Sequence, residues 1–559
     1  MKLKIVGGGQ VNLSKRDFVG SGGEGSVYVR GDTAYKIYAK SDRVIPEGKL
    51  RDLSGIKNPN VIRPLNMLMS LKNKPVGYTM KFVQGGVPIC QMFTKAYKKR
   101  NGIDPQMVLG IVQDMQEGLR SIHAADVLVV DLNEMNLLVK SSDVFWIDVD
   151  SYETRNYPAT AIMDSIRDWH ANGKWSRETD WFSWGIVSFQ MFMGIHPYKG
   201  KHQSVKKMPD RMKQNLSVFN QEVKVPKMVP SFDTIPEAYR RWYHAVFEEG
   251  RRVPPPKDLA AVVVLATPRQ ISSTDKIKIS EINSFDMDVL RYARLGGLDL
   301  VAMDGGIVCL TNGRGTPITL RGDGHFGHTE AKAPLYGRWK GGEAILVDPR
   351  TGGAVGHPVP CQSMMAYEGH FYVHQGDNII EMTAKEVGGA TMLFPHPVAN
   401  VMPKATQLFD GVAIQNMLGT WYASVFPASK RSYQVRLADL DGYRVVDAKH
   451  DRGVLIVIGT KNGQYDKFVY RFERDYTRTI LFWKDEDVVY SGVNFVTLDK
   501  GVCAHIDEAE DLVLFGSSPS ADGVKRISDP VLGGDMRLFR RDNDVVFARG
   551  KQLFKLATK

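Results

Sequence analysis

The spacing of hydrophobic residues divides the chain into two parts with different patterns. In residues 109–125, apolar side chains recur every three or four positions, roughly, which predicts one long amphipathic helix. The positions that carry this spacing are Leu109, Val112, Met115, Leu119 and Ile122. Apolar segments that end near residue 36 and residue 83 come before this helix and are typical of strands. The pattern therefore predicts strands followed by a long helix in the first part of the chain.

From about residue 271 the pattern changes to short alternating strands separated by Gly, Asp and Asn turns. The clearest of these strands cover residues 298–302, 306–310, 370–374, 453–458, 467–472 and 544–548. Hairpins recur about every 40 residues, which predicts roughly six or seven four-stranded blades of a β-propeller over residues 271–559. No W-D or kelch signature is present, so two stacked β-sandwiches are the alternative all-β fold.

The composition is that of globular domains. The chain has 559 residues, of which 24% are charged and 43% hydrophobic, and this length predicts about two to four domains. The four cysteines lie far apart without a C-x-x-C pair, which favours buried thiols over a zinc site or a disulfide framework. They are Cys90, Cys309, Cys361 and Cys503.

The N-terminal segment has no apolar run long enough for a signal peptide. The longest later apolar run, residues 259–266, is far shorter than a membrane span. We therefore expect a cytoplasmic protein with no membrane span.

The net charge of +11 is unevenly distributed. Residues 1–265 hold about 38 Lys and Arg against about 27 Asp and Glu, and the remainder is balanced. Two basic clusters, at residues 95–100 and 199–213, favour ATP, acidic protein segments or nucleic acid as partners, although solvated faces are the commoner explanation. Because no aromatic residues alternate with these charges, nucleic acid is not the favoured partner.

An acid and amide pattern carries the main candidate chemistry. Asp131 is followed five residues later by Asn136, and Asp148 comes after one short predicted hairpin. Phosphoryl transfer needs a carboxylate that orients the attacking hydroxyl, and oxygen ligands on two segments that hold Mg²⁺ against nucleotide phosphates. The spacing therefore predicts Asp131 as the catalytic acid/base, and Asn136 and Asp148 as magnesium ligands. Alone this pattern is weak, because Asp and Asn are common in turns.

A glycine-rich segment and a lysine lie upstream. The segment fits G-x-G-x-x-G-x-V at its fixed positions, which are Gly20, Gly22, Gly25 and Val27. Glycines let backbone amides approach phosphates, and the valine would cover adenine. Ala34 would leave room for the base, and Lys36 would reach the phosphates. Taken singly, these are a hairpin turn and a strand lysine with a solvated charge. Their order and distances favour a nucleotide site.

Together these motifs resemble the protein-kinase fold over about the first 260 residues. Three further segments add to the resemblance: residues 58–65, 179–185 and 196–198. The resemblance implies a bilobal α+β domain with a small lobe of about 1–84 and a large lobe of about 85–265. It also implies that Met80 is the gatekeeper and that the backbone from Lys81 to Val83 binds adenine.

The sequence also departs from the kinase pattern at several motif positions. Val130 stands where H-R-D has its arginine, and Asn133 stands where a lysine is usual beside the catalytic acid. Asp148, Val149 and Asp150 replace D-F-G, and no A-P-E signature follows before residue 180. The D-L-N-x-x-N and I-D-V-D-S motifs resemble a divergent bacterial and phage-type Ser/Thr kinase group. This resemblance implies ATP and Mg²⁺ as cofactors and a catalytic set that includes Asn133.

Glu47 is the carboxylate best placed in the sequence to pair with Lys36, and Asp52 competes with it. Gly48 weakens this segment as a helix by about 1 kcal/mol. A solvated helix carboxylate is the alternative role for either acid.

Two classes of function remain open. The first is an active Ser/Thr-type protein kinase whose C-terminal β domain docks a protein substrate or partner. The second is a weak or inactive pseudokinase that serves as a binding or structural protein, virion-associated if phage-encoded. The complete set of Lys36, Asp131, Asn136 and Asp148 favours the first class, and the missing A-P-E segment favours the second.

A proline-rich stretch, residues 253–257, closes the first part of the chain. Because such a stretch is stiff and exposed, we expect two domains, residues 1–265 and 271–559. Residues 259–265 would form a last helical turn or a strand that crosses into the second domain.

Overall fold

The structure, a computed structural model, describes residues 1–226, 228–256, 271–311, 313–320, 322–489, 492–516 and 523–559. The chain forms two compact units. The N-terminal unit comprises Met1–Pro268 with Thr460–Tyr465 and Glu486–Gly492, and the all-β unit comprises Arg269–Gly459, Asp466–Asp485 and Val493–Lys559. The predicted boundary between residues 265 and 271, Lys257 and the segment 259–265 lie outside the described residues. The division at this boundary therefore stays a prediction.

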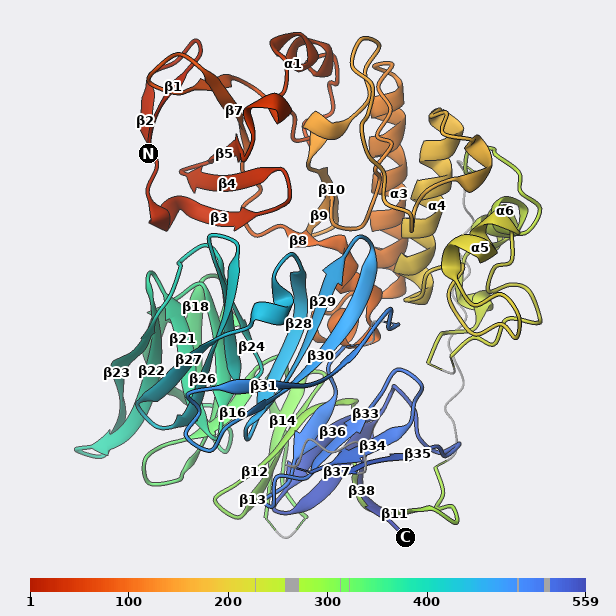
Figure 1. The fold of residues 1–559 in the computed structure, drawn as a ribbon. Helices are drawn as coiled ribbons and strands as arrows, with labels where there is room; N and C mark the ends of the chain where they lie inside the picture. Colours follow the sequence, from red (N-terminus) through yellow and green to blue (C-terminus); the bar gives the residue numbers. More distant parts are fainter. Residues whose placement is uncertain (227, 257–270, 312, 321, 490–491, 517–522) are drawn as a thin grey trace. The chain divides into compact units, whose positions relative to one another are not determined.

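A seven-stranded sheet of order β2-β1-β6-β7-β5-β4-β3 opens the N-terminal unit (Figure 1). Its strands are β1 (Lys2–Ile5), β2 (Gln10–Asn12), β3 (Phe18–Ser21), β4 (Gly25–Arg30), β5 (Thr33–Tyr38), β6 (Met67–Met69) and β7 (Pro75–Lys81). In the register of β5 with β7, Lys36 lies opposite Tyr78. Because side chains alternate along a strand, Lys36 and Tyr38 share one face, while Tyr35 packs with Leu3 and Leu68 on the other.

A second, three-stranded sheet and the helices complete the N-terminal unit. The sheet has the order β10-β9-β8, with strands β8 (Val87–Pro88), β9 (Leu137–Lys140) and β10 (Asp143–Trp146). The helices are α1 (Glu47–Leu53), α2 (Lys95–Arg100), α3 (Pro105–His123), α4 (Arg177–Met193), α5 (Met208–Lys213) and α6 (Glu237–Phe247). Short 3-10 turns occur at Lys15–Asp17, Ser41–Arg43, Ile89–Phe93, Val149–Ser151, Trp169–Ala171 and Phe232–Thr234.

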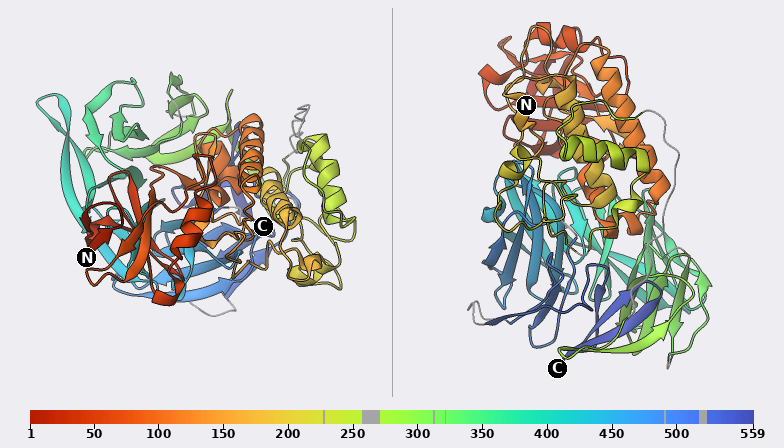
Figure 2. Two further views of the ribbon diagram at one scale, coloured as in Figure 1. Left: turned by 90° about the horizontal axis from the view of Figure 1, so that it is seen from above. Right: turned by 90° about the vertical axis from the view of Figure 1, so that its right-hand side faces the viewer.

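The two longest helices, α3 and α4, lie side by side (Figures 1 and 2). α3 covers most of the helix expected over residues 109–125, and Asp104 caps its start by accepting a hydrogen bond from the Met107 amide at 2.7 Å. α4 begins after Ser176 and ends at Gly194, which has a left-handed φ of 69°. α4 is apolar on nearly all sides, and its first turn carries the buried Asp180.

In the residues that the structure describes, the all-β unit has seven separate four-stranded antiparallel sheets. Six of them have their strands in chain order. The first five are β12 (Val289–Leu295), β13 (Leu298–Met303), β14 (Gly306–Leu310) and β15 (Ile318–Thr319); β16 (His325–His328), β17 (Pro334–Lys340), β18 (Glu343–Val347) and β19 (Ala354–Pro360); β20 (Ser363–Tyr367), β21 (His370–Gln375), β22 (Asn378–Val387) and β23 (Ala390–Asn400); β24 (Thr406–Phe409), β25 (Val412–Met417), β26 (Thr420–Ala428) and β27 (Arg431–Arg436); β28 (Arg444–Asp451), β29 (Val454–Lys461), β30 (Gln464–Phe472) and β31 (Thr479–Asp485). The sixth has β32 (Phe495–Thr497), β33 (Cys503–Ile506), β34 (Leu512–Phe515) and β35 (Val524–Ile527). A 3-10 turn lies at Ala438–Leu440.

The last sheet joins the two ends of the all-β unit. It consists of β36 (Arg537–Arg541), β37 (Asp544–Arg549), β38 (Gln552–Thr558) and β11 (Ile277–Ser284). Because β11 comes before all the other strands of the unit and pairs with β38, the first and last segments of this unit close on each other.

Packing between neighbouring sheets explains the apolar runs in the second half of the sequence. In β29, Leu455 and Val457 pack with the strands of the preceding sheet, whereas Val454 and Ile456 pack with the following one. Both faces of such a strand are buried, so its side chains are apolar on both faces.

The predicted fold class is wrong. An α+β bilobal kinase-like domain followed by a six- or seven-bladed β-propeller was expected, but the structure is 17% helical and 42% strand and shows no kinase-like α/β lobe. The extra strands β1 and β2 extend the N-terminal sheet into a half-barrel. The segment between α3 and α4 holds only β9, β10 and two 3-10 turns. The short motifs that resemble kinases therefore do not determine a large helical lobe.

In the part of the chain that the structure describes, no helix is both long enough and apolar enough to cross a membrane.

Candidate functional site

The site is centred on Lys36, a buried lysine of β5. Its Nζ atom lies 2.7 Å from Asp148 Oδ1, 2.7 Å from Asp150 Oδ2 and 3.4 Å from Glu24 Oε2. Only 8% of the Lys36 side chain is exposed, against 36% for Asp148 and 48% for Glu24. Lys36 therefore joins the hairpin before β4 to the segment after β10.

Asp150 is the most enclosed of these acids, with 3% of its side chain exposed. Each of its two oxygens accepts a bond from Lys36 Nζ and one from a tyrosine hydroxyl. Tyr78 donates to Oδ1 at 2.6 Å, and Tyr38 donates to Oδ2. A buried carboxylate is tolerated when its oxygens are bonded in this way.

Burial and electrostatic attraction have opposite effects on the pKa values of Lys36 and Asp150. Burial alone would lower the pKa of Lys36, but attraction to Asp150 and Asp148 outweighs it, so the pKa is raised. Burial would raise the pKa of Asp150, but Lys36 and the two tyrosine hydroxyls hold that pKa below its usual value. Lys36 is therefore an ammonium and Asp150 a carboxylate at neutral pH.

Asp131 lies in a loop whose backbone is clamped from α4. Asp180 accepts hydrogen bonds from the amides of Val129 at 2.9 Å and Val130 at 2.8 Å, and His123 Nε2 lies 2.8 Å from the same carboxylate. Val130 has a φ of 63°, which is rare for a β-branched residue and costs energy. The clamp from Asp180 holds this strained conformation immediately before Asp131.

The carboxylate of Asp131 has a raised pKa of about 6. Burial is the main cause, and the negative charges of Asp148 and Glu24 add to it. Hydrogen bonds from the Met163 amide and from Asn133 Nδ2, both 2.9 Å long, act in the opposite direction. A carboxylate with a pKa near 6 is suited to accept a proton at neutral pH.

The two predicted amides lie beside Asp131. Asn133 is fully buried, and its Nδ2 donates to the Asp131 carboxylate, so it orients this group. Asn136 Nδ2 donates to the Asp131 carbonyl at 3.2 Å, which leaves the Asn136 Oδ1 atom as the available ligand. The Ile147 amide donates to the Asn136 carbonyl at 3.0 Å, which keeps Asn136 close to the segment that carries Asp148.

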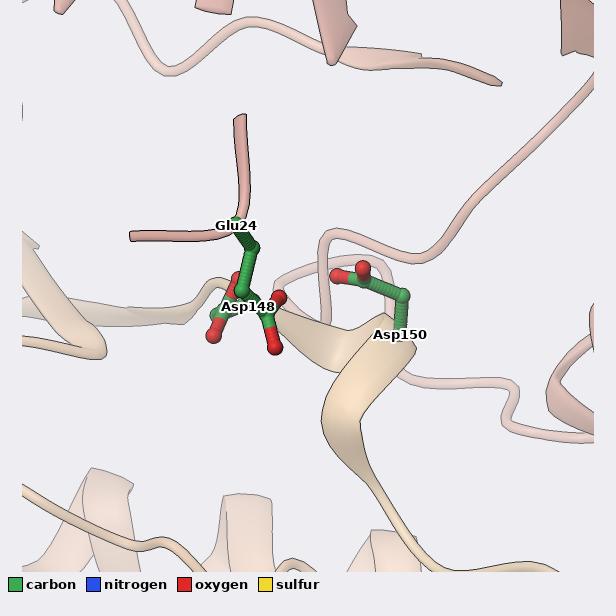
Figure 3. A group of neighbouring side chains, drawn as sticks. All are labelled: Glu24, Asp148 and Asp150. Atoms are coloured by element: carbon green, nitrogen blue, oxygen red, sulfur yellow. The ribbon is translucent and has the colours of Figure 1, made fainter. Parts of the chain in front are cut away.

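Glu24, Asp148 and Asp150 form an acidic trio whose ligand oxygens all lie within 4.8 Å of one another (Figure 3). Figure 3 shows Glu24 and Asp148 close together, with Asp150 on the turn that follows Asp148. Asp148 has a left-handed φ of 60°. Carboxylate oxygens are the ligands that Mg²⁺ prefers. The trio contains the predicted ligand Asp148 and two acids that the sequence had not assigned to the metal.

The glycine-rich segment is the hairpin between β3 and β4. The Gly22 amide donates to the Gly25 carbonyl at 2.9 Å. A Cβ atom at Gly25 would lie 2.2 Å from the Ile37 carbonyl oxygen, so no larger residue fits there. At Gly20 and Gly22 a Cβ atom would meet nothing within 4 Å. Packing within the protein therefore does not explain these two glycines, whereas a close ligand would.

The residues expected around adenine lie along β4, β5 and β7. Val27 is opposite Lys36, and Ala34 is opposite Met80. Met80 packs on the apolar cluster that contains Val83, while Lys81 is exposed. The structure thus places Val27, Ala34 and Met80 on adjacent paired strands.

The expected pair between Glu47 and Lys36 is not formed. Glu47 Oε1 accepts a bond from Arg51 Nη1 at 3.1 Å, and about 70% of both side chains is exposed. Asp52, the competing candidate, accepts a bond from the Thr154 hydroxyl at 2.9 Å. Asp150 replaces both as the buried partner of Lys36.

Sequence reasoning had not assigned four residues of the site: Glu24, Tyr38, Tyr78 and Asp150. Asp150 stood in the I-D-V-D-S motif but was considered only as the residue that replaces a glycine. The alternation along β5 could have placed Tyr38 on the face of Lys36. No local signal pointed to Tyr78 or Glu24, because their positions depend on strand register and hairpin conformation.

The sequence matches no protein-family model, and it matches no curated protein.

Proposed function

We propose that this protein is an ATP-dependent phosphotransferase, specifically a Ser/Thr-type protein kinase whose all-β unit docks its substrate or partner. The observation that carries the proposal is the convergence of Lys36, Asp148 and Asp131. Lys36 contacts Asp148 at 2.7 Å, and the charge of Asp148 contributes to the raised pKa of Asp131. A cation, a metal-ligating acid and a proton acceptor are the groups that phosphoryl transfer requires.

The residues present fit ATP and Mg²⁺. Glu24 and Asp148 offer partly exposed carboxylates. Asn136, whose carbonyl accepts a bond from the residue before Asp148, would offer an amide oxygen. Space beside Gly20 and Gly22 would let phosphates approach the backbone of this hairpin without a side chain in the way. Bound ATP and Mg²⁺ would supply the γ-phosphoryl group and the positive charge that stabilises its transfer.

Each protein group has a distinct task in this proposal. Lys36 would hold the phosphates, with Asp150 fixing the position of its ammonium. Asp131 would accept the proton of the acceptor hydroxyl at its carboxylate, oriented by Asn133 and the Met163 amide. Asp180 would keep the loop of Asp131 in its strained conformation.

One observation favours a second candidate, a pseudokinase that binds nucleotide or a partner without turnover. The ammonium of Lys36 already pairs with both Asp148 and Asp150, so it would have to exchange at least one of these carboxylates for a phosphate oxygen. Such a rearrangement costs energy, because an ion pair of low exposure is broken.

Phosphoryl transfer decides between the two candidates. The full chain would be incubated with γ-³²P-labelled ATP and Mg²⁺, with casein and myelin basic protein as acceptors. We expect labelled acceptor with the wild type and Asp143→Ala, an exposed carboxylate of β10, and none with Asp131→Ala. Nucleotide binding without label in any sample would support the pseudokinase, and equal labelling by Asp131→Ala would refute the assigned role of this residue.

A further inference from the structure

The side chain of helix α1 that is buried beside the site belongs to a lysine, Lys49, and not to an acid. Glu47 and Arg51 are exposed and pair with each other, whereas Lys49 between them is only 7% exposed. Among the described residues, Lys49 makes no hydrogen bond and no ion pair within 4 Å. A buried lysine without such a partner is costly, because its ammonium has lost water and gained nothing equivalent.

The charges around Lys49 are those of the site. Burial lowers the pKa of Lys49, the carboxylates of Asp150, Glu24 and Glu153 raise it, and the ammonium of Lys36 lowers it; the net pKa is lowered. Lys49 is therefore within electrostatic reach of Lys36 and of two members of the acidic trio, Asp150 and Glu24.

The two acids nearest to Lys49 in its electrostatic surroundings, Asp150 and Glu153, accept hydrogen bonds from other donors. Both oxygens of Asp150 already accept two bonds each, from Lys36 and from the hydroxyls of Tyr38 and Tyr78. Glu153 Oε2 accepts a bond from the Ala159 amide at 3.1 Å. The ammonium of Lys49 thus lacks an anion in a region where every nearby protein acid has another donor.

The position of Lys49 is fixed by the packing of α1 on the segment that follows Asp148. Asp52 accepts a bond from Thr154, and α1 contacts the turn Val149–Ser151. A Cβ atom at Gly48 would lie 2.0 Å from the Tyr157 hydroxyl, so the glycine allows this close approach. Gly48, which weakens the helix, is therefore explained by packing that holds Lys49 beside the site.

We propose that Lys49 is a second phosphate-binding cation of the site, which pairs with a non-bridging oxygen of a nucleoside triphosphate. This inference rests on the proposed function, since it assigns the phosphate chain of that nucleotide to Lys49 and Lys36 together. A polyphosphate suits the site better than a carboxylate ligand because an acidic trio able to hold a divalent cation lies next to the two lysines.

The assignment also accounts for Asn133, which stands where kinases carry a lysine. Asn133 is fully buried and bonded to Asp131, so it adds no positive charge. Lys49 supplies from α1 the cation that the loop of Asp131 lacks.

Calorimetric titration of the full chain tests the proposal with three ligands: MgATP, adenosine and magnesium tripolyphosphate. The variants are Lys49→Met, Lys49→Arg and, as a matched control, Arg51→Met on the exposed side of α1. We expect Lys49→Met to bind MgATP and tripolyphosphate about tenfold to a hundredfold more weakly than the wild type, with adenosine affinity unchanged. Lys49→Arg should keep most of the affinity, and Arg51→Met should keep all of it.

The melting temperature of the ligand-free chain supplies a second readout. Lys49→Met removes a buried unpaired ammonium and keeps an unbranched side chain, so this variant should melt at the same temperature as the wild type or higher. A large fall in the melting temperature would show that Lys49 is a structural residue and would overturn the proposal.

The ligands separate the inference from the proposed function. Wild-type affinity for tripolyphosphate in Lys49→Met would overturn the role of Lys49 and leave the phosphotransferase standing. Tripolyphosphate binding that depends on Lys49, without binding of ATP, would refute the nucleotide function and keep the phosphate site. A wild type that binds none of the three ligands would overturn both.

Discussion

Lys36 Nζ lies 2.7 Å from Asp150 Oδ2, and this contact links β5 to the turn after Asp148 in the interior of the N-terminal unit. The hydroxyls of Tyr38 and Tyr78 also donate hydrogen bonds to Asp150. The partner of the lysine is therefore two residues beyond the predicted metal ligand, and it does not come from α1.

Removing the Asp150 charge should destabilise the N-terminal unit strongly. Asp150→Ala leaves the hydroxyls of Tyr38 and Tyr78 without their acceptor and removes the most buried partner of Lys36, which we expect to cost about 3 kcal/mol or more. Glu47→Ala, which removes an exposed pair, should change stability by less than about 0.5 kcal/mol. Urea unfolding followed by tryptophan fluorescence measures both. Equal effects of the two variants would show that Asp150 does not anchor Lys36.

The rate of phosphoryl transfer should depend on the ionisation of Asp131. Its pKa of about 6 means that the carboxylate is mostly ionised at pH 7.5 and protonated below pH 6. Since the ionised form accepts the proton, kcat/KM should fall tenfold per pH unit below about pH 6. Asn133→Ala removes a bond that lowers this pKa, so its acid limb should move to higher pH. A limb that stays in place in Asn133→Ala would contradict the role of Asn133.

The all-β unit should lose stability in mild acid. Burial lowers the pKa of His450 and of His505 to about 3, whereas an unfolded histidine has a pKa of about 6.5. The unfolded chain therefore binds protons that the folded chain does not, and stability falls as the pH drops from 6.5. His450→Phe, which keeps ring contacts with Tyr367 and Phe472, should reduce the slope by about one proton between pH 6.5 and 5. Urea midpoints at several pH values would show an unchanged slope if this interpretation is wrong.

The two parts of the chain should fold separately. Residues 271–559 carry their own buried clusters between sheets, so this fragment should give a strand-rich circular dichroism spectrum and bind no ATP. Residues 1–265 should keep ATP binding. Limited proteolysis would check the boundary, and an unfolded C-terminal fragment would contradict the two-domain division.

The sequence singled out Lys36, Asp131 and Asp148, and the structure places these three residues close together, whereas the predicted fold class is wrong. Lys36, Asp131 and Asp148 could be chosen because each residue type and its spacing suit phosphates, protons or metals. Asp150 could not be chosen as the partner of Lys36, because the conformation after β10 decides which of two neighbouring acids turns inward. Lys49 could not be identified from the sequence either, because its burial depends on how closely α1 packs against Tyr157 at Gly48.

Parts of the fold could not be predicted from the local hydrophobic pattern of the sequence. The apolar spacing in residues 109–125 identified α3, because a periodic segment of that length has few alternatives. The strands β1 and β2 were missed because short strands carry little periodicity and gain their stability from neighbours. In the second half, alternating strands predicted repeated hairpins, and the structure has seven four-stranded sheets whose closure through β11 depends on contacts between distant segments.

The magnesium dependence of ATP binding tests the central claim most directly. Calorimetry on the full chain would compare ATP affinity with Mg²⁺ and with EDTA, for the wild type and for Asp148→Asn. The account predicts at least about tenfold tighter binding with Mg²⁺ for the wild type, and no such difference for Asp148→Asn. Equal wild-type affinity with and without Mg²⁺ would contradict a metal-dependent nucleotide site built on Lys36 and Asp148.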